Sequence, residues 1–185
     1  MRCVDYIKDV AFQTFLPPED VSAIIAEPIQ GEGGYIVPPD EFFPRLKKIC
    51  DQYGIPLIID EIQSGFGRTG KMFAIQHWGV NPDIICLAKG IASGMPLGAT
   101  VAKAELDFKH EGSHSNTFGG NLVACEAALA TIATIEEEKL AENAAKVGGY
   151  IIKRLREMME SHPLIGDVRG KGLMIGGELG KDHKT

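Results

Sequence analysis

Two ionisable side chains of opposite charge lie at the ends of two short apolar segments. Asp60 ends residues 56–60, PLIID, and Lys89 follows residues 83–88, DIICLA. A lysine amine can form a Schiff base with an aldehyde, and a carboxylate can hold a proton on a pyridine nitrogen. An amine and an acid at the ends of two buried strands are what a site for pyridoxal 5'-phosphate (PLP) needs. We therefore expect Lys89 and Asp60 to form such a site.

Two further polar features are expected to converge on the same place. Glu27 ends the apolar segment 21–27, and ligands of open α/β sheets bind beside the carboxyl ends of the strands. Residues 114–121, HSNTFGGN, precede an alanine-rich helical pattern. A hydroxyl group and free backbone N–H groups at a helix start suit a phosphate. This segment is therefore the expected phosphate contact.

The apolar pattern predicts strands alternating with helices. Four short apolar runs are typical of buried strands, and they cover residues 21–27, 56–60, 83–88 and 96–102. Amphipathic or alanine-rich patterns predict helices over residues 42–53, 121–136 and about 139–161, and Gly54 is expected to end the first of them. Glycine-spaced residues 168–179 predict one more strand. The order indicates an α/β fold with a largely parallel sheet.

Two details of the helices follow from the same pattern. Asp40 and Glu41 are expected in the first turn of the helix over residues 42–53, where a negative charge is favourable. The apolar stripe from Leu140 to Met158 is expected to pack against the main domain.

Composition narrows the class of protein. The chain has 185 residues, 44% of them hydrophobic, and a net charge of −6, which argues against nucleic acid as a partner. No apolar run is long enough for a membrane span, and charged residues interrupt the first twelve, so we expect no secretory signal. The four cysteines form no CxxC pair. We expect them to be reduced and mostly buried, in a cytoplasmic protein.

Two other binding functions are weighed and set aside. Residues 65–70, GFGRTG, match the glycine spacing of a dinucleotide-binding loop. Such glycines should follow a strand directly and open a long helix, whereas residues 61–64 intervene and a turn begins near residue 79. Tight turning beside the cofactor is therefore the expected role of these glycines. The five histidines have no metal-ligand spacing.

Several long motifs, in order, resemble class-III aminotransferases, which are PLP-dependent enzymes. They are EPIQGEGG (27–34), DEIQSGFGRTG (60–70), LAKGIASGMPLGA (87–99), SNTFGGN (115–121) and DVRGKGLMIGGEL (167–179). The resemblance covers nearly the whole chain and is closest in look to 4-aminobutyrate aminotransferase. It implies the α/β large domain of a fold-type-I PLP-dependent transferase, its second half over residues 1–140, and the start of the small C-terminal domain over residues 141–185.

The resemblance also implies a role for each matching residue around the ring. Lys89 holds the cofactor aldehyde as a Schiff base and then moves the proton between substrate and cofactor. Asp60 keeps the pyridine nitrogen protonated. Gln63 donates a hydrogen bond to the phenolic oxygen of the ring.

Three more residues take roles at the edge of the site. Thr117 contacts the cofactor phosphate, in this family that of the neighbouring subunit, so a homodimer is implied for the full-length enzyme. Glu32 resembles the gate residue that pairs with a substrate-binding arginine. Glu27 supports the site nearby and takes no chemical step. Leu122 departs from the family, which usually has proline at this position.

The implied reaction is transfer of an amino group from an ω-amino acid such as 4-aminobutyrate to 2-oxoglutarate. Because family members are more than twice as long, the chain is expected to be a fragment lacking both ends, from Met1 as an internal start to Thr185 as an early end. The missing parts would carry the phosphate cradle and the substrate-carboxylate arginine, so little activity is expected of this segment alone. Two alternatives stay open: an amino-acid racemase or aminomutase using the same residues, and a non-catalytic truncated chain.

Overall fold

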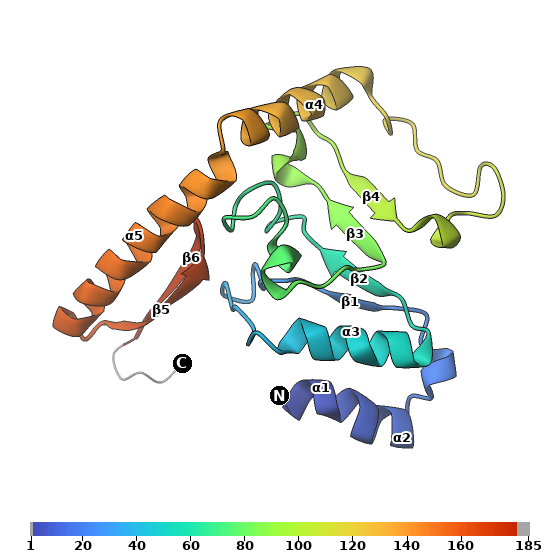
Figure 1. Cartoon of the computed structure of the whole chain (residues 1–185), viewed down its shortest axis with the longest axis horizontal. Coiled ribbons are helices and arrows are strands. Elements are labelled where there is room, and N and C mark those ends of the chain that lie inside the picture. Colours follow the sequence, from blue (N-terminus) through green and yellow to red (C-terminus); the bar gives the residue numbers. More distant parts are fainter. Residues whose placement is uncertain (1, 181–185) are drawn as a thin grey trace.

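The structure is a computed structural model that describes residues 2–180, so Met1 and the last five residues, including Thr185, lie outside it. Its central sheet has the order β1-β2-β3-β4 (Figure 1). The strands are Ile24–Ala26, Leu57–Asp60, Ile84–Leu87 and Ala99–Ala102. The first three are parallel and β4 is antiparallel to β3. The expected α/β fold with a largely parallel sheet is confirmed, although β1 is shorter than the predicted run.

Helices flank this sheet and a β-hairpin follows them. The helices are α1 (Arg2–Tyr6), α2 (Phe12–Thr14), α3 (Phe42–Tyr53), α4 (Leu122–Glu137) and α5 (Leu140–Ser161). The hairpin consists of β5 (Ile165–Lys171) and β6 (Met174–Leu179), paired antiparallel. Shorter π or 3-10 turns span Ile7–Ala11, Pro18–Asp20, Ala74–Trp78, Lys89–Ala92 and Ala104–Leu106. No helix within residues 2–180 is long and apolar enough to cross a membrane.

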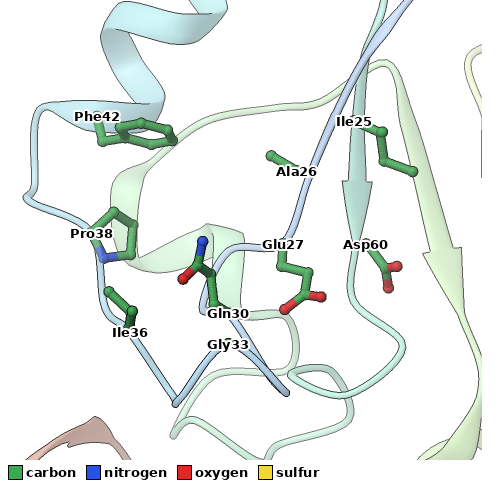
Figure 2. Close-up of a pocket in the computed structure, with 9 residues that line it drawn as sticks. All are labelled: Ile25, Ala26, Glu27, Gln30, Gly33, Ile36, Pro38, Phe42 and Asp60. Carbon is green, nitrogen blue, oxygen red and sulfur yellow. The ribbon is translucent and has the colours of Figure 1, made fainter. Parts of the chain in front are cut away.

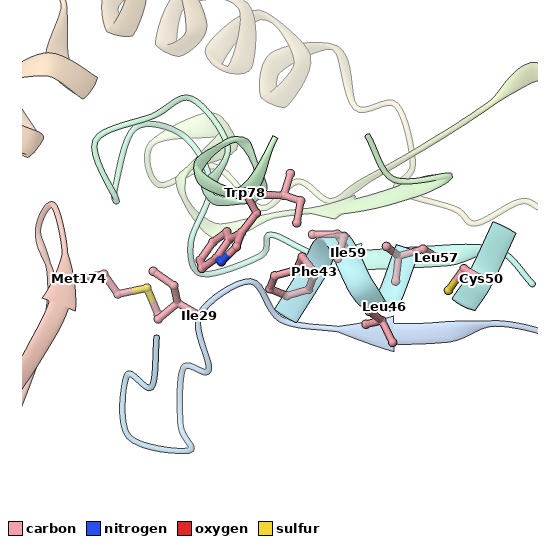
Figure 3. Packing of buried hydrophobic residues seen from close by; sticks show 9 residues of the cluster. Ile29, Phe43, Leu46, Cys50, Leu57, Ile59, Trp78 and Met174 are labelled. Atoms are coloured by element: carbon pink, nitrogen blue, oxygen red, sulfur yellow. The ribbon is translucent and has the colours of Figure 1, made fainter. Parts of the chain in front are cut away.

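The main core lies between α3 and one face of the sheet (Figure 3). Phe43 and Leu46 of α3 pack against Leu57 and Ile59 of β2 and are almost completely buried. Full burial of each such side chain stabilises the fold by about 1.5–3 kcal/mol. Met174 of β6 joins the same cluster, 2% exposed, so the hairpin is anchored in the core of the sheet.

Several sequence-based expectations need correction. Residues 168–179 form parts of two strands, because Gly172 at φ +54° lets the chain reverse between them. The stripe on α5 packs against β5, which follows it directly in the chain, and Val147 and Met158 remain 37% and 46% exposed. Asp40 and Glu41 precede the first turn of α3, with Glu41 at the N-cap position.

The structure also shows the helix ends and the state of the cysteines. Gly54 ends α3 in the left-handed conformation as predicted, and Asn121 caps α4 by accepting a hydrogen bond from the Ala124 N–H. All four cysteines are free, but only Cys50 is fully buried. No cluster of three metal-ligating side chains occurs among the described residues. A domain boundary near residue 140 coincides with the start of α5 and stays a prediction.

Asp83, which directly precedes β3, links the start of β2 to the end of β4. Its carboxylate accepts hydrogen bonds from the Leu57 backbone N–H at 2.9 Å, from Lys47 Nζ on α3 at 3.0 Å and from Lys103 Nζ after β4 at 2.6 Å. Burial alone would raise the pKa of Asp83, but these three donors outweigh it and lower the pKa to about 2. The ionised carboxylate therefore stabilises the pairing of the strands that carry the site.

Glu61 fixes the chain directly after β2. Its side chain is fully buried, and it accepts hydrogen bonds from Ser64 Oγ at 2.6 Å, Ala74 N at 3.0 Å and Ile75 N at 2.7 Å. Burial raises the pKa of Glu61, and the three donors only partly offset that effect. The Gly65 N–H also donates to the Glu61 carbonyl at 2.9 Å. The turn after Asp60 is thus held to the turn that begins at Ala74.

Asp83→Asn should lower the free energy of unfolding at pH 7 by roughly 1–2 kcal/mol, since the amide keeps the Leu57 contact but loses its charge. A carboxylate with a lowered pKa stabilises the fold above its unfolded pKa, and this stability is lost as pH falls from about 4 towards 2. Urea unfolding of variant and parent at pH 7 and pH 2 checks this, with the exposed Asp40→Asn as control. An equal difference at both pH values would contradict it.

Glu61→Gln should lower the free energy of unfolding by about 1–3 kcal/mol, because the amide nitrogen would face a backbone donor with no acceptor. Urea unfolding at pH 7 measures this, and the exposed Glu142→Gln is the matched control. An unchanged midpoint for Glu61→Gln would show that its three hydrogen bonds do not hold the turn.

Candidate active site

The ends of β1, β2 and β3 lie at one edge of the sheet and carry three of the predicted residues. Glu27 directly follows β1, Asp60 is the last residue of β2, and Lys89 comes two residues after β3. The register pairs Ala26 with Ile59 and Asp60 with Cys86. In the structure these side chains therefore lie at or just after the strand ends, where the sequence predicted them.

Glu27 and Asp60 line one hollow of about 590 Å³ beside β1. Figure 2 shows Glu27 between Gln30 and Asp60, and all three residues line this hollow. Asp60 Oδ1 accepts a hydrogen bond from Ile62 N at 2.9 Å, which orients it. Glu27 accepts one from the Gly31 N–H and so fixes the loop after β1.

Lys89 and Gln63 line a second hollow, of about 280 Å³. Lys89 Nζ donates a hydrogen bond to Gln63 Oε1 at 3.0 Å. Gln63 Nε2 in turn donates to Tyr35 Oη at 3.3 Å. Lys89 has a φ of +47°, a conformation that costs free energy for a residue other than glycine. The backbone is thus bent at the residue that carries the amine.

The loop after β1 connects the two hollows. Gly31 donates its N–H to Glu27 at the first hollow, and its Cα lies against the Gln63 side chain at the second. A Cβ at Gly31 would overlap Gln63 Oε1, so a larger residue there would push the Gln63 amide aside. Displacement of the loop would therefore disturb both hollows together.

The second hollow suits an anion. Its lining includes the cationic side chains of Lys89 and Arg68, and no carboxylate among the described residues that line it.

Cys86 of β3 is paired with Asp60 of β2 in the sheet. Burial first and the Asp60 charge second raise the pKa of the Cys86 thiol. Cys86 is therefore a neutral neighbour of Asp60 at neutral pH.

Thr117 and Glu32 are not brought into these hollows. Thr117 lies in an exposed turn before α4, and Glu32 is exposed in the loop after β1. Neither belongs to the described lining of either hollow.

Four residues near the site were missed by the sequence reasoning. Glu61 directly follows Asp60 in the segment DEIQSG, whose polar residues gave no signal for its burial. Tyr35, Arg68 and Leu173 line the hollow of Lys89. Leu173 comes from the turn of the hairpin, and its N–H donates to the Arg68 carbonyl at 2.9 Å. No local pattern announces such a contact between distant segments.

The chain is similar to known proteins over its whole length. The family described as "Aminotransferase class-III" matches residues 1–185. A leucine/methionine racemase of Thermococcus litoralis is 52% identical, over 100% of this chain and 42% of its own length. A 4-aminobutyrate aminotransferase of Mycobacterium leprae is 49% identical, over 88% of this chain and 37% of its own.

A solved structure resembles the whole arrangement. An amine transaminase from an uncultivated Pseudomonas species, in its PLP-bound form, matches with a TM-score of 0.92 and 43% identity. The match covers 98% of this chain and 43% of that chain. The chain thus spans about two-fifths of the length of the relatives it matches. Because the family match covers residues 1–185, the chain belongs to the class-III aminotransferase family.

Proposed function

We propose that Lys89, Asp60 and Gln63 form part of the PLP site of an enzyme that transfers amino groups. The observation that carries the proposal is the contact of Lys89 Nζ with Gln63 Oε1, 3.0 Å, at the sheet edge that also carries Asp60. An amine, an amide and a carboxylate at one edge suit the aldehyde, phenolic oxygen and pyridinium nitrogen of this cofactor. The pair of cations in the second hollow suits its negative charge.

The cofactor, when bound, supplies an aldehyde that combines with amines and a ring that takes up electrons. Lys89 Nζ takes the proton from the substrate carbon that bears the amino group and returns it to a carbon acceptor. The Asp60 carboxylate holds a proton on the ring nitrogen by charge pairing. Gln63 orients the ring by donating from Nε2, and its Oε1 restrains Lys89.

The other predicted residues take supporting roles. Glu27 holds the loop at Gly31, and Glu32 on the same loop is the gate beside the substrate. Thr117 contacts phosphate across the interface of a homodimer, which agrees with the exposure of its turn. This assembly and a cytoplasmic location stay predictions.

The substrates follow from the family. We infer transfer from an ω-amino acid such as 4-aminobutyrate to 2-oxoglutarate, supported by the 49% identity to a 4-aminobutyrate aminotransferase. Racemisation of an amino acid is the second candidate, favoured by the 52% identity to a leucine/methionine racemase over the whole chain. Both reactions begin with removal of a proton from the carbon that bears the amino group, so both use Lys89. The non-catalytic alternative requires that neither reaction occurs.

Borohydride reduction of the chain with PLP should attach the cofactor to Lys89 in preference to the other lysines, because Gln63 holds its amine in place. Peptide mapping by mass spectrometry identifies the modified residue. Lys89→Ala should lose most of the incorporated cofactor, whereas Lys153→Ala, on the exposed face of α5, should keep it. Incorporation at another lysine with Lys89 unmodified would refute the proposed site.

Product analysis decides between the two reactions. Transfer predicts that 4-aminobutyrate and 2-oxoglutarate yield glutamate, whereas racemisation predicts that L-leucine loses optical activity without an oxo acid. Lys89→Ala should lower either rate by at least about a hundredfold, the usual contribution of a general base. Cofactor attached to Lys89 without either product would instead support the non-catalytic alternative.

A further inference from the structure

Tyr35 lies beside the amine of Lys89 and is linked to it by one side chain. Its Oη accepts a hydrogen bond from Gln63 Nε2 at 3.3 Å, and Gln63 Oε1 accepts one from Lys89 Nζ at 3.0 Å. All three side chains line the same hollow of about 280 Å³. Gln63 therefore has a phenol at its nitrogen end and an amine at its oxygen end.

The chemistry of the three groups allows one orientation of the amide. A lysine ammonium has three donors and no acceptor, so the amide oxygen must face Lys89. The amide nitrogen then faces Tyr35, whose hydroxyl oxygen can accept. Without that oxygen, the amide loses the contact that holds its nitrogen away from Lys89. A rotated amide would place a donor against a donor.

The loop holds the phenol in place despite an unfavourable backbone. Tyr35 has a φ of +55°, in the left-handed region that bulky residues rarely adopt. Gly34 N and Tyr35 N both donate to the Gly31 carbonyl, at 3.1 and 3.3 Å. Arg169 Nε of the hairpin donates to the Gly34 carbonyl at 2.9 Å. Contacts from both sides therefore maintain a conformation that costs free energy.

Arg169 is itself held in place. Its guanidinium pairs with Glu178 at 2.7 Å and with Asp167 at 2.5 Å, both on the same hairpin. The ring of Tyr35 also packs at the edge of the main core and against Gly176, where a Cβ would lie 3.1 Å from the tyrosine Cβ. The hairpin thus packs against Tyr35 and is hydrogen-bonded to the residue before it.

We propose that Tyr35 is a positioning residue, whose hydroxyl oxygen sets the orientation of the Gln63 amide and thereby restrains Lys89 Nζ. The inference deepens the proposed function, on which it rests for the role of Lys89. The chain of contacts itself exists without a cofactor, so it can be tested apart from that function.

Acetic anhydride labelling of the cofactor-free chain measures the restraint on Lys89. Mass spectrometry gives the labelling rate of Lys89 relative to Lys153 at pH 7.5, a value chosen at roughly neutral pH because lysine amines are then mostly protonated. Tyr35→Phe should raise this ratio about two- to tenfold, the factor for loss of one hydrogen bond. Tyr53→Phe, the same change in a cluster away from Lys89, should leave it unchanged. An unchanged ratio in Tyr35→Phe overturns the proposal.

A double-mutant cycle tests whether Tyr35 acts through Gln63. Gln63→Leu should raise the labelling ratio at least as much as Tyr35→Phe does, and adding Tyr35→Phe to Gln63→Leu should have no further effect. A further increase in the double variant would show that Tyr35 acts on Lys89 by another route, and the proposal fails. General loosening of the fold would instead raise the labelling of Lys47 in parallel, because its side chain is only 17% exposed.

Borohydride trapping of PLP gives the second readout. The positioning role predicts slower trapping at Lys89 in Tyr35→Phe, about two- to tenfold, although the small labelling reagent reacts faster. Equal trapping rates in variant and parent would overturn the proposal. If the parent chain traps no PLP at Lys89, the proposed function fails, and the labelling cycle still decides the role of Tyr35.

Discussion

The parallel pairing of β1, β2 and β3 is the constraint on which the site depends. Leu57 and Ile59 alternate with Asp60 along β2, so burial of the first two against α3 turns the carboxylate to the other face. A shift of one residue in this register would bury Asp60 under the helix and expose the apolar pair. Asp83 opposes such a shift, since its three donors come from β2, α3 and the end of β4. Burial of Leu57 and Ile59, together with the contacts of Asp83 at the opposite ends of the strands, thus places Asp60 at the edge that carries the site.

The hairpin completes the hollow of Lys89 from the far end of the sequence. Met174 is buried in the main core, and Leu173 beside it is bonded to the Arg68 carbonyl. The turn approaches α5 so closely that a Cβ at Gly148 would overlap the Gly172 carbonyl oxygen. Backbone contact of this kind leaves little freedom for the hairpin to move relative to α5. The hairpin therefore packs against Tyr35 and lines the hollow of Lys89 with Leu173 and Met174.

Sequence reasoning reached the parts of this arrangement that follow from local pattern. Apolar runs located the strands that end at Asp60 and before Lys89, and Gly54 marked the end of α3, because burial and helix termination act over a few residues. Residues 168–179 were predicted as one strand and not as parts of a hairpin. Their glycines interrupt the alternation of apolar and polar residues, so the turn at Gly172 could not be located in the sequence. Tyr35 has no local signal at all: its hydroxyl contacts Gln63, 28 residues away, and the preceding residue, Gly34, accepts a hydrogen bond from Arg169, 135 residues away. The roles of Gln63, Thr117 and Glu32 came from the family resemblance and stay predictions.

Lys89 and the hairpin residues that line its hollow are far apart in the sequence, and this separation has a consequence for biosynthesis. Leu173 and Met174 must leave the ribosome before the lining of the hollow beside the amine is complete, although the strand preceding Lys89 is made much earlier. During that interval the apolar surface that Met174 covers would be unprotected. The hollow is therefore complete only after residues 89–174 have been made, and a nascent chain that stalls before the hairpin would leave the apolar surface of the main core uncovered.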